Sequence, residues 1–192
     1  MYQNSNKQLD IISLYSPNYK AEFYLRQISK LAKLPLKTCQ NTLTLLEKMN
    51  ILKSKIDGKN KYFSLNLDNI QTKSHLLQAE VYKTGTFLEK YPPFKTFLKE
   101  LKTNIFVVIF GSFAKLTADK NSDLDLLIVS DKEEKLPFHL LPYKIHEIIL
   151  LESSFIKAVK EQENLIKEIE ENHLILNNHS FYINTMWENY GK

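Results

Sequence analysis

The sequence has very little cysteine and arginine, and it has no long hydrophobic segment. Its single cysteine, Cys39, cannot form an internal disulfide, and its helical context favours a core position over catalysis. No apolar run approaches the ~18 residues of a membrane-spanning helix, and the first residues, MYQNSNK, lack the pattern of a secretory leader. We therefore expect a soluble, cytoplasmic protein without a disulfide framework.

Composition and charge set broad limits. With 192 residues, of which 43% are hydrophobic and 25% charged, the chain can form one large globular domain or two small ones. Residues 1–70 contain 11 Lys and Arg against 5 Asp and Glu, whereas the remainder is slightly acidic. Basic charge is thus concentrated in the N-terminal third, which favours contact with nucleic acid there.

The most informative stretch is residues 105–129, IFVVIFGSFAKLTADKNSDLDLLIV. An apolar, β-branched run predicts a buried strand that ends at Gly111-Ser112, where small residues allow a ligand to approach the backbone. A helical turn follows, and a helix N-terminus favours phosphate. Asp123 and Asp125 open a second strand and project from the same face, because side chains alternate. Two carboxylates beside a phosphate-binding turn indicate a site for a magnesium-bound nucleotide.

This motif resembles the nucleotidyltransferase superfamily that includes DNA polymerase β, and most closely its minimal nucleotidyltransferases. The matching positions are Gly111, Ser112, Ala114, Lys115, Ser122, Asp123, Asp125 and Leu126. The sequence departs from the family at Leu116, where glycine is usual. The resemblance implies that Asp123 and Asp125 bind Mg²⁺, and that the NTP is bound by Gly111, Ser112, Lys115 and Ser122. The alternative is an ordinary strand–helix–strand segment with a surface Asp-x-Asp.

A third strand is predicted over residues 143–151. Enzymes of this superfamily place a third carboxylate on such a strand, and Glu147 is the only acidic residue within it. The resemblance therefore implies a catalytic and metal-binding role for Glu147, with a surface glutamate as the alternative. Its neighbour His146 could be a base or a ligand, but a lone histidine beside a strand is more often structural.

The N-terminal third predicts three short helices, over residues 9–15, 24–32 and 36–49, and then a hairpin through Asp57-Gly58. This order resembles the winged helix-turn-helix of bacterial and archaeal regulators, over about residues 8–68. It implies double-stranded DNA as a partner, contacted through Lys37, Thr38, Gln40, Asn41, Thr44 and Lys48 of the third helix and Lys53, Lys55, Lys59 and Lys61 of the hairpin. The alternative is a protein-binding or dimerising module.

The remaining segments are mainly helical. A linking helix over residues 74–90 packs through Leu77, Val81 and Leu88, or forms a dimer interface. A helix capped by Ser153-Ser154 is expected to run to about Glu171, followed by a short apolar piece. The aromatic residues of a last helix, over residues 181–190, favour core packing over nucleobase stacking.

The predicted fold class is α+β: a winged helix (1–70), linking helices (71–102) and a small mixed-sheet nucleotidyltransferase domain with C-terminal helices (103–192). The predicted function is Mg²⁺-dependent NMP transfer from an NTP to a hydroxyl acceptor, coupled to DNA binding. Minimal nucleotidyltransferases often act on proteins, including toxin partners of toxin–antitoxin pairs, so the resemblance implies a protein acceptor. The alternative is a transcriptional regulator whose nucleotidyltransferase fold only senses a nucleotide or a partner. A third hypothesis, transfer to RNA or a small molecule, lacks a distinct acceptor domain.

Overall fold

The computed structural model describes residues 6–119 and 122–191. The chain divides into two compact units, the first ending at Ala79 and including Tyr190, and the second running from Glu80 to Asn189. The helix α4 (Ile70–Lys90) contributes residues to both. Within the described residues, no helix is both long enough and apolar enough to cross a membrane.

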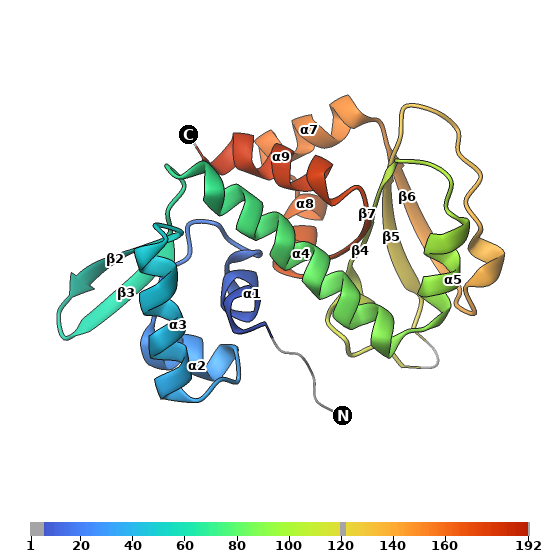
Figure 1. Cartoon of the computed structure of the whole chain (residues 1–192). Helices are drawn as coiled ribbons and strands as arrows, with labels where there is room; N and C mark the ends of the chain where they lie inside the picture. Colours follow the sequence, from blue (N-terminus) through green and yellow to red (C-terminus); the bar gives the residue numbers. More distant parts are fainter. Residues whose placement is uncertain (1–5, 120–121, 192) are drawn as a thin grey trace. The chain divides into compact units, whose positions relative to one another are not determined.

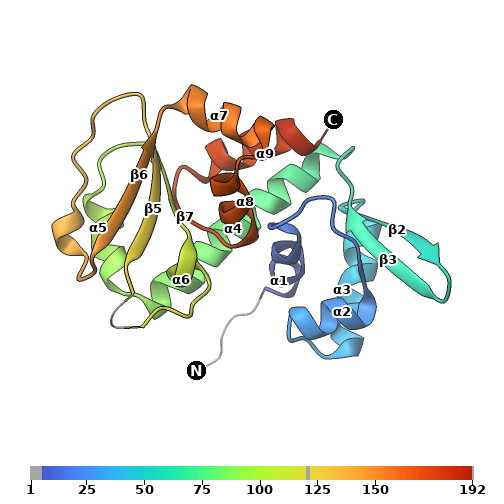
Figure 2. The same ribbon diagram turned by 180° about the vertical axis from the view of Figure 1, so that it is seen from behind.

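The first unit combines three helices with a small antiparallel sheet. Its elements are α1 (Lys7–Ile12), η1 (Ser13–Tyr15), β1 (Phe23–Tyr24), α2 (Leu25–Leu31), α3 (Leu36–Lys48), β2 (Leu52–Asp57) and β3 (Asn60–Leu65). The strands are ordered β1-β3-β2. Gly58 adopts φ +58° in the tight turn between Asp57 and Asn60, which are paired, so the predicted hairpin is confirmed. Figure 2 shows this hairpin extending beyond α2 and α3.

The helix α3 shows how its pattern defines the core of the first unit. Cys39, Leu43 and Leu46 are buried, as their spacing predicts. Leu36 was predicted on the same face but is 47% exposed, because it occupies the first position of the helix. After the helix, Asn50 adopts φ +59°, the left-handed conformation predicted for it, and the Ile51 amide donates to the carbonyl oxygen of Leu46.

The elements of the second unit after α4 are α5 (Pro93–Glu100), β4 (Phe106–Ile109), α6 (Gly111–Ala114), β5 (Leu124–Val129), η2 (Phe138–Leu140), β6 (Ile145–Leu150), α7 (Glu152–Glu161), α8 (Asn164–Glu171), β7 (Leu174–Asn177) and α9 (His179–Tyr190). The strands form a mixed four-stranded sheet in the order β6-β5-β4-β7 (Figure 1). β4 pairs antiparallel with β5 and β7, whereas β5 and β6 are parallel. A parallel pair needs a long crossover, and here it contains η2.

Side chains of β4 alternate between two apolar layers. Val107 and Ile109 join a core with Phe87 of α4 and the aromatic residues of α5. Phe106 faces the other way, its ring centroid 5.5 Å from that of Phe155 in α7 and 5.8 Å from that of Tyr182 in α9. Figure 1 shows α5 on one side of the sheet and α9 on the other. The central strand β4 is therefore covered on both faces, which accounts for its continuous apolar sequence.

The C-terminal part differs from its predicted elements in three ways. The single helix expected to end near Glu171 is two helices, because Gln162 adopts φ +54° and ends α7. No serine side chain caps α7, whose first amide, at Glu152, bonds instead to Oδ1 of Asp131. The short apolar piece after His173 is the strand β7, which pairs with β4. Its four residues carry too little pattern to predict a strand without the partner.

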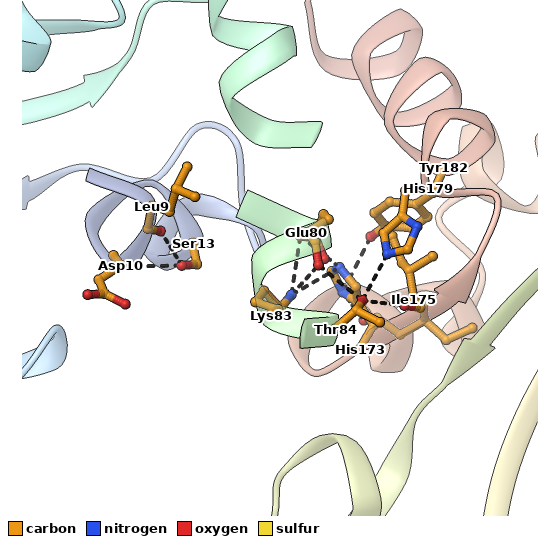
Figure 3. A network of polar contacts seen from close by, with 11 residues as sticks. Leu9, Asp10, Ser13, Glu80, Lys83, Thr84, His173, Ile175, His179 and Tyr182 are labelled. Atoms are coloured by element: carbon orange, nitrogen blue, oxygen red, sulfur yellow. Dashed lines mark hydrogen bonds and ion pairs between the residues drawn. The ribbon is translucent and has the colours of Figure 1, made fainter. Parts of the chain in front are cut away.

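A buried polar network joins α4 to the segments on either side of β7 (Figure 3). The carboxylate of Glu80 lies 3.2 Å from Nε2 of His173, and both side chains are 1% exposed. Nζ of Lys83 lies 2.9 Å from the same carboxylate. Beside them, Oγ1 of Thr84 is 2.8 Å from Nε2 of His179, and burial lowers the pKa of His179. The buried face of α4 is thus partly polar, whereas Val81, predicted to pack, is 50% exposed.

We predict that Glu80→Ala lowers the free energy of unfolding by about 3–5 kcal/mol, because it leaves the buried His173 and the half-buried Lys83 without their carboxylate. Urea denaturation followed by circular dichroism measures this change.

The matched control is Glu89→Ala on the same helix. The Glu89 side chain is 77% exposed and pairs with Lys95 at 2.8 Å. Its removal is expected to change stability by less than about 0.5 kcal/mol. Equal effects of the two substitutions would show that the buried network adds nothing to stability.

Candidate functional site

The turn after β4 brings the backbone of Gly111 against a carboxylate of β5. The Phe110 amide donates to the carbonyl oxygen of Asp125 at 3.1 Å, which holds the end of β4 beside the start of β5. Gly111 then adopts φ +66°, and a Cβ placed there would collide with Oδ2 of Asp125. Both its conformation and the space that the carboxylate occupies therefore favour glycine at position 111.

Asp123 directly precedes β5 and Asp125 is its second residue, so by the alternation of an extended chain the two side chains lie on the same side. That spacing corresponds to about 6.5 Å along a strand. Leu124, between them, points to the opposite face and is part of the apolar core. The side chains of Asp123 and Asp125 are 43% and 28% exposed, so both are accessible to a ligand from solvent. The predicted arrangement of the two carboxylates is thus present in the structure.

Two basic side chains at the start of β6 contact these carboxylates, one each: Lys144 directly precedes the strand, and His146 is its second residue. Nζ of Lys144 lies 2.9 Å from Oδ2 of Asp123, and this hydrogen bond raises the pKa of Lys144. Nδ1 of His146 lies 3.1 Å from Oδ1 of Asp125, its partner in the parallel register. Sequence analysis did not assign Lys144 a role and treated His146 as structural. Lys144 and His146 have the same two-residue spacing as Asp123 and Asp125. That spacing could identify them as partners only once β5 and β6 were known to be neighbours.

Glu147, predicted as a third carboxylate, does not share the face of the two aspartates in the register of the sheet. Glu147 pairs with Leu126, one position beyond the pair of Asp125 and His146. Because side chains alternate along a strand, Glu147 projects from the face opposite to Asp125. The face that carries the two aspartates receives His146 from β6 instead.

The other predicted nucleotide-binding residues surround the same turn. Ser112 follows Gly111 in α6, and its carbonyl oxygen accepts from the amide of Thr117 at 3.0 Å. Lys115 is exposed at the end of α6. The hydroxyl of Ser122 accepts from the amide of Asp119 at 2.9 Å, which closes the loop before β5. Two residues of this loop, 120 and 121, lie outside the described residues.

The backbone conformation at Leu116 shows why glycine is usual at this position of the family pattern. It adopts φ +58°, a conformation that favours glycine, and its side chain is 46% exposed. Its carbonyl oxygen accepts from Nζ of Lys90 at 3.1 Å. The backbone of the turn is thus the one that a glycine would adopt, and a leucine there carries a conformational cost of about 1–2 kcal/mol.

The carboxylates of Asp123 and Asp125 are the groups at this site that suit Mg²⁺. Within the described part of the chain, no three or more His, Cys, Asp or Glu side chains form a cluster that could hold a metal ion. Two carboxylates on one face do suit Mg²⁺, which is commonly bound by one or two carboxylates together with substrate phosphates. The missing Cβ of Gly111 also leaves room for Oδ2 of Asp125 on the side of the turn. Asp123 and Asp125 are therefore the residues that would hold the ion.

Comparison with known proteins agrees with this geometry. Residues 93–179 match the nucleotidyltransferase domain family. The match supports placing this segment in the nucleotidyltransferase superfamily, and it implies an NTP substrate and nucleotidyl transfer as the general class of activity. Such domains generally use divalent metal ions such as Mg²⁺. No curated protein and no solved structure matches the chain.

We predict that Gly111→Ala destabilises the protein by about 1–2 kcal/mol, because alanine is strained at positive φ, and that it displaces the carboxylate of Asp125. Thermal shift should show weaker binding of Mg²⁺ and NTP, and urea denaturation should show the lower free energy of unfolding.

Gly85→Ala is the matched control. Gly85 lies within α4, and no atom lies within 4 Å of a Cβ added there. Alanine should stabilise the helix by about 0.5–1 kcal/mol and leave nucleotide binding unchanged. If Gly111→Ala behaved in the same way, neither the strain nor the contact with Asp125 would matter.

Proposed function

We propose that the protein is a Mg²⁺-dependent nucleotidyltransferase that moves an NMP group from an NTP to a hydroxyl acceptor. In this reaction the acceptor oxygen bonds to the α-phosphorus, the bond from that phosphorus to the bridging oxygen breaks, and pyrophosphate leaves. The observation that carries the proposal is the packing of Asp125 against the bare Cα of Gly111, which joins a carboxylate pair to a phosphate-binding turn.

Each residue of the site has a role that follows from its position. Asp123, just before β5, and Asp125, within it, bind the ion on the side opposite the apolar core. Ser112 and the neighbouring amides hold the β- and γ-phosphates, and Lys115 adds positive charge at the end of α6. When bound, Mg²⁺ neutralises phosphate charge and helps align an in-line attack. Lys144, whose side chain is 80% exposed, is free to leave Asp123 when the ion binds.

A protein is the proposed acceptor. Support comes from the resemblance to minimal nucleotidyltransferases, many of which modify proteins, including the toxin of a toxin–antitoxin pair.

We predict covalent transfer of label from an α-³²P-labelled NTP, with Mg²⁺, to the chain itself or to the protein encoded by the neighbouring gene. Label from a γ-³²P-labelled NTP should not transfer, because pyrophosphate carries it away. Asp123→Asn and Asp125→Asn should each reduce transfer to background, since each removes a charged ligand of the ion.

The matched control is Glu147→Gln, which removes an acidic side chain from the opposite face of the same sheet. It should retain transfer. Loss of transfer in Glu147→Gln would support the catalytic role predicted for Glu147 from the sequence. Absence of both label transfer and Mg²⁺-dependent NTP binding in the unaltered protein would contradict the proposed activity.

We also propose that the first unit is a winged helix that binds double-stranded DNA. The observation that favours this second function is the exposure of the predicted contact residues of α3, among them Lys37, Gln40 and Asn41. In the hairpin, Lys53 and Lys59 are exposed, and among the described residues no carboxylate pairs with either.

Two other hairpin lysines are less available to phosphates. Lys55 pairs with Glu22 at 2.7 Å, and Lys61 pairs with Glu47 at 2.8 Å. The sequence-based prediction gave all four lysines equal weight. The ion pairs favour Lys53 and Lys59 as the principal phosphate contacts.

We predict that Lys53→Glu combined with Lys59→Glu weakens binding to the chain's own upstream DNA and lowers the slope of log K against log salt by about 2. Fluorescence anisotropy over a salt series measures both quantities. Lys99→Glu combined with Lys167→Glu changes net charge equally on exposed residues of the second unit and should have little effect. Equal losses for the two double variants would contradict a DNA site on the hairpin.

A further inference from the structure

We propose that His146 is a positioning residue that holds the carboxylate of Asp125 in the orientation required for metal binding. This inference rests on the proposed nucleotidyltransferase function. His146 occupies the position beside Asp125 that the sequence suggested for Glu147, but it acts there as a hydrogen-bond donor and not as a carboxylate ligand. His146 donates a hydrogen bond to the carboxylate that holds the ion, rather than contributing a further charge to it.

The two oxygens of Asp125 have different neighbours. Oδ1 lies 3.1 Å from Nδ1 of His146 on β6. Oδ2 faces the Cα of Gly111, at a position where any Cβ would collide with it. The carboxylate therefore extends from the imidazole on one side to the phosphate-binding turn on the other. Of its two oxygens, Oδ2 is the one directed to the place where a nucleotide phosphate would lie.

Strand register accounts for the contact. β5 and β6 are parallel, and Asp125 pairs directly with His146. Leu124 donates its amide to the carbonyl oxygen of Lys144 at 2.8 Å, which holds the two strands in this register next to the site. Paired side chains of neighbouring strands project from the same face. The imidazole is thus placed beside Asp125 by the backbone, and a glutamate at position 147 cannot reach that place.

The exposure of His146 argues against a merely structural role. Its side chain is 65% exposed, so it contributes little to the core. Histidine at an exposed edge position could be replaced by many residues if packing were its only function. Such residues would lack a hydrogen-bond donor at the position of Nδ1, which lies 3.1 Å from Oδ1 of Asp125.

The chemistry of the contact favours metal binding. An ionised carboxylate only accepts hydrogen bonds, so Nδ1 carries the proton of this bond. A neutral imidazole can donate it without adding a positive charge that repels the ion. Lys144 differs in this respect, because its ammonium group places a full positive charge beside the carboxylate of Asp123. Removing hydrogen-bond partners of metal ligands commonly lowers metal affinity by about 10–100-fold.

The test is titration of the full chain with Mn²⁺, a paramagnetic substitute for Mg²⁺, with free Mn²⁺ measured by electron paramagnetic resonance. His146→Leu removes the donor and should weaken Mn²⁺ binding by about 10–100-fold. His146→Asn places an amide N–H near the position of Nδ1 and should recover most of the affinity. Glu147→Gln, the neighbouring change on the other face, should bind as the unaltered protein does.

The outcomes separate this inference from the function on which it rests. Unchanged Mn²⁺ affinity in a folded His146→Leu would overturn the positioning role while leaving the metal site intact. Equal weakening in His146→Leu and His146→Asn would also overturn it, because the hydrogen-bond donor would then not be the relevant property. Failure of the unaltered protein to bind Mn²⁺ would overturn the proposed metal site itself. Circular dichroism of each variant confirms that it is folded.

Discussion

The close approach of Asp125 to Gly111 is the contact on which the candidate site depends. The carboxylate occupies this space because residue 111 has no Cβ, and glycine adopts φ +66° without the strain that other residues incur. The contact links the end of β4 to the start of β5, which the amide of Phe110 also joins. The turn after β4 and the acidic pair are thereby one structure, and a change in either affects the other.

The same contact depends on the layers of the second unit. β4 is buried on both faces, which fixes its position between β5 and β7. Alternation along β5 then directs Leu124 and Leu126 into the core with α4 and α5 and leaves Asp123 and Asp125 on the other face. Apolar burial therefore determines where the charged residues lie. The carboxylates need no interaction of their own to be brought to the same side.

Two side chains at the start of β6 contact the aspartates. Lys144 directly precedes this strand and His146 is its second residue, and they contact Asp123 and Asp125 respectively. One partner is a full cation, and the other can donate a hydrogen bond while neutral. In the proposed function the two aspartates therefore have different roles: Asp123 would exchange its lysine for the ion, whereas His146 would hold Asp125 in place. The buried network of Glu80 and His173 elsewhere in this unit has the opposite character, because it is closed to solvent.

Local pattern by itself determined a large part of this protein. The apolar run before Gly111, the Asp-x-Asp spacing, the amphipathic α3 and the turn at Gly58 each express a rule that acts over a few residues, and each is present as predicted. Tertiary structure decided the rest. β7 is too short to be recognised without β4, and the buried face of α4 includes Glu80 and Thr84, whose burial depends on partners distant in sequence. The choice between His146 and Glu147 required the register of two strands separated by a crossover, and a shift of one residue reverses the face of every side chain.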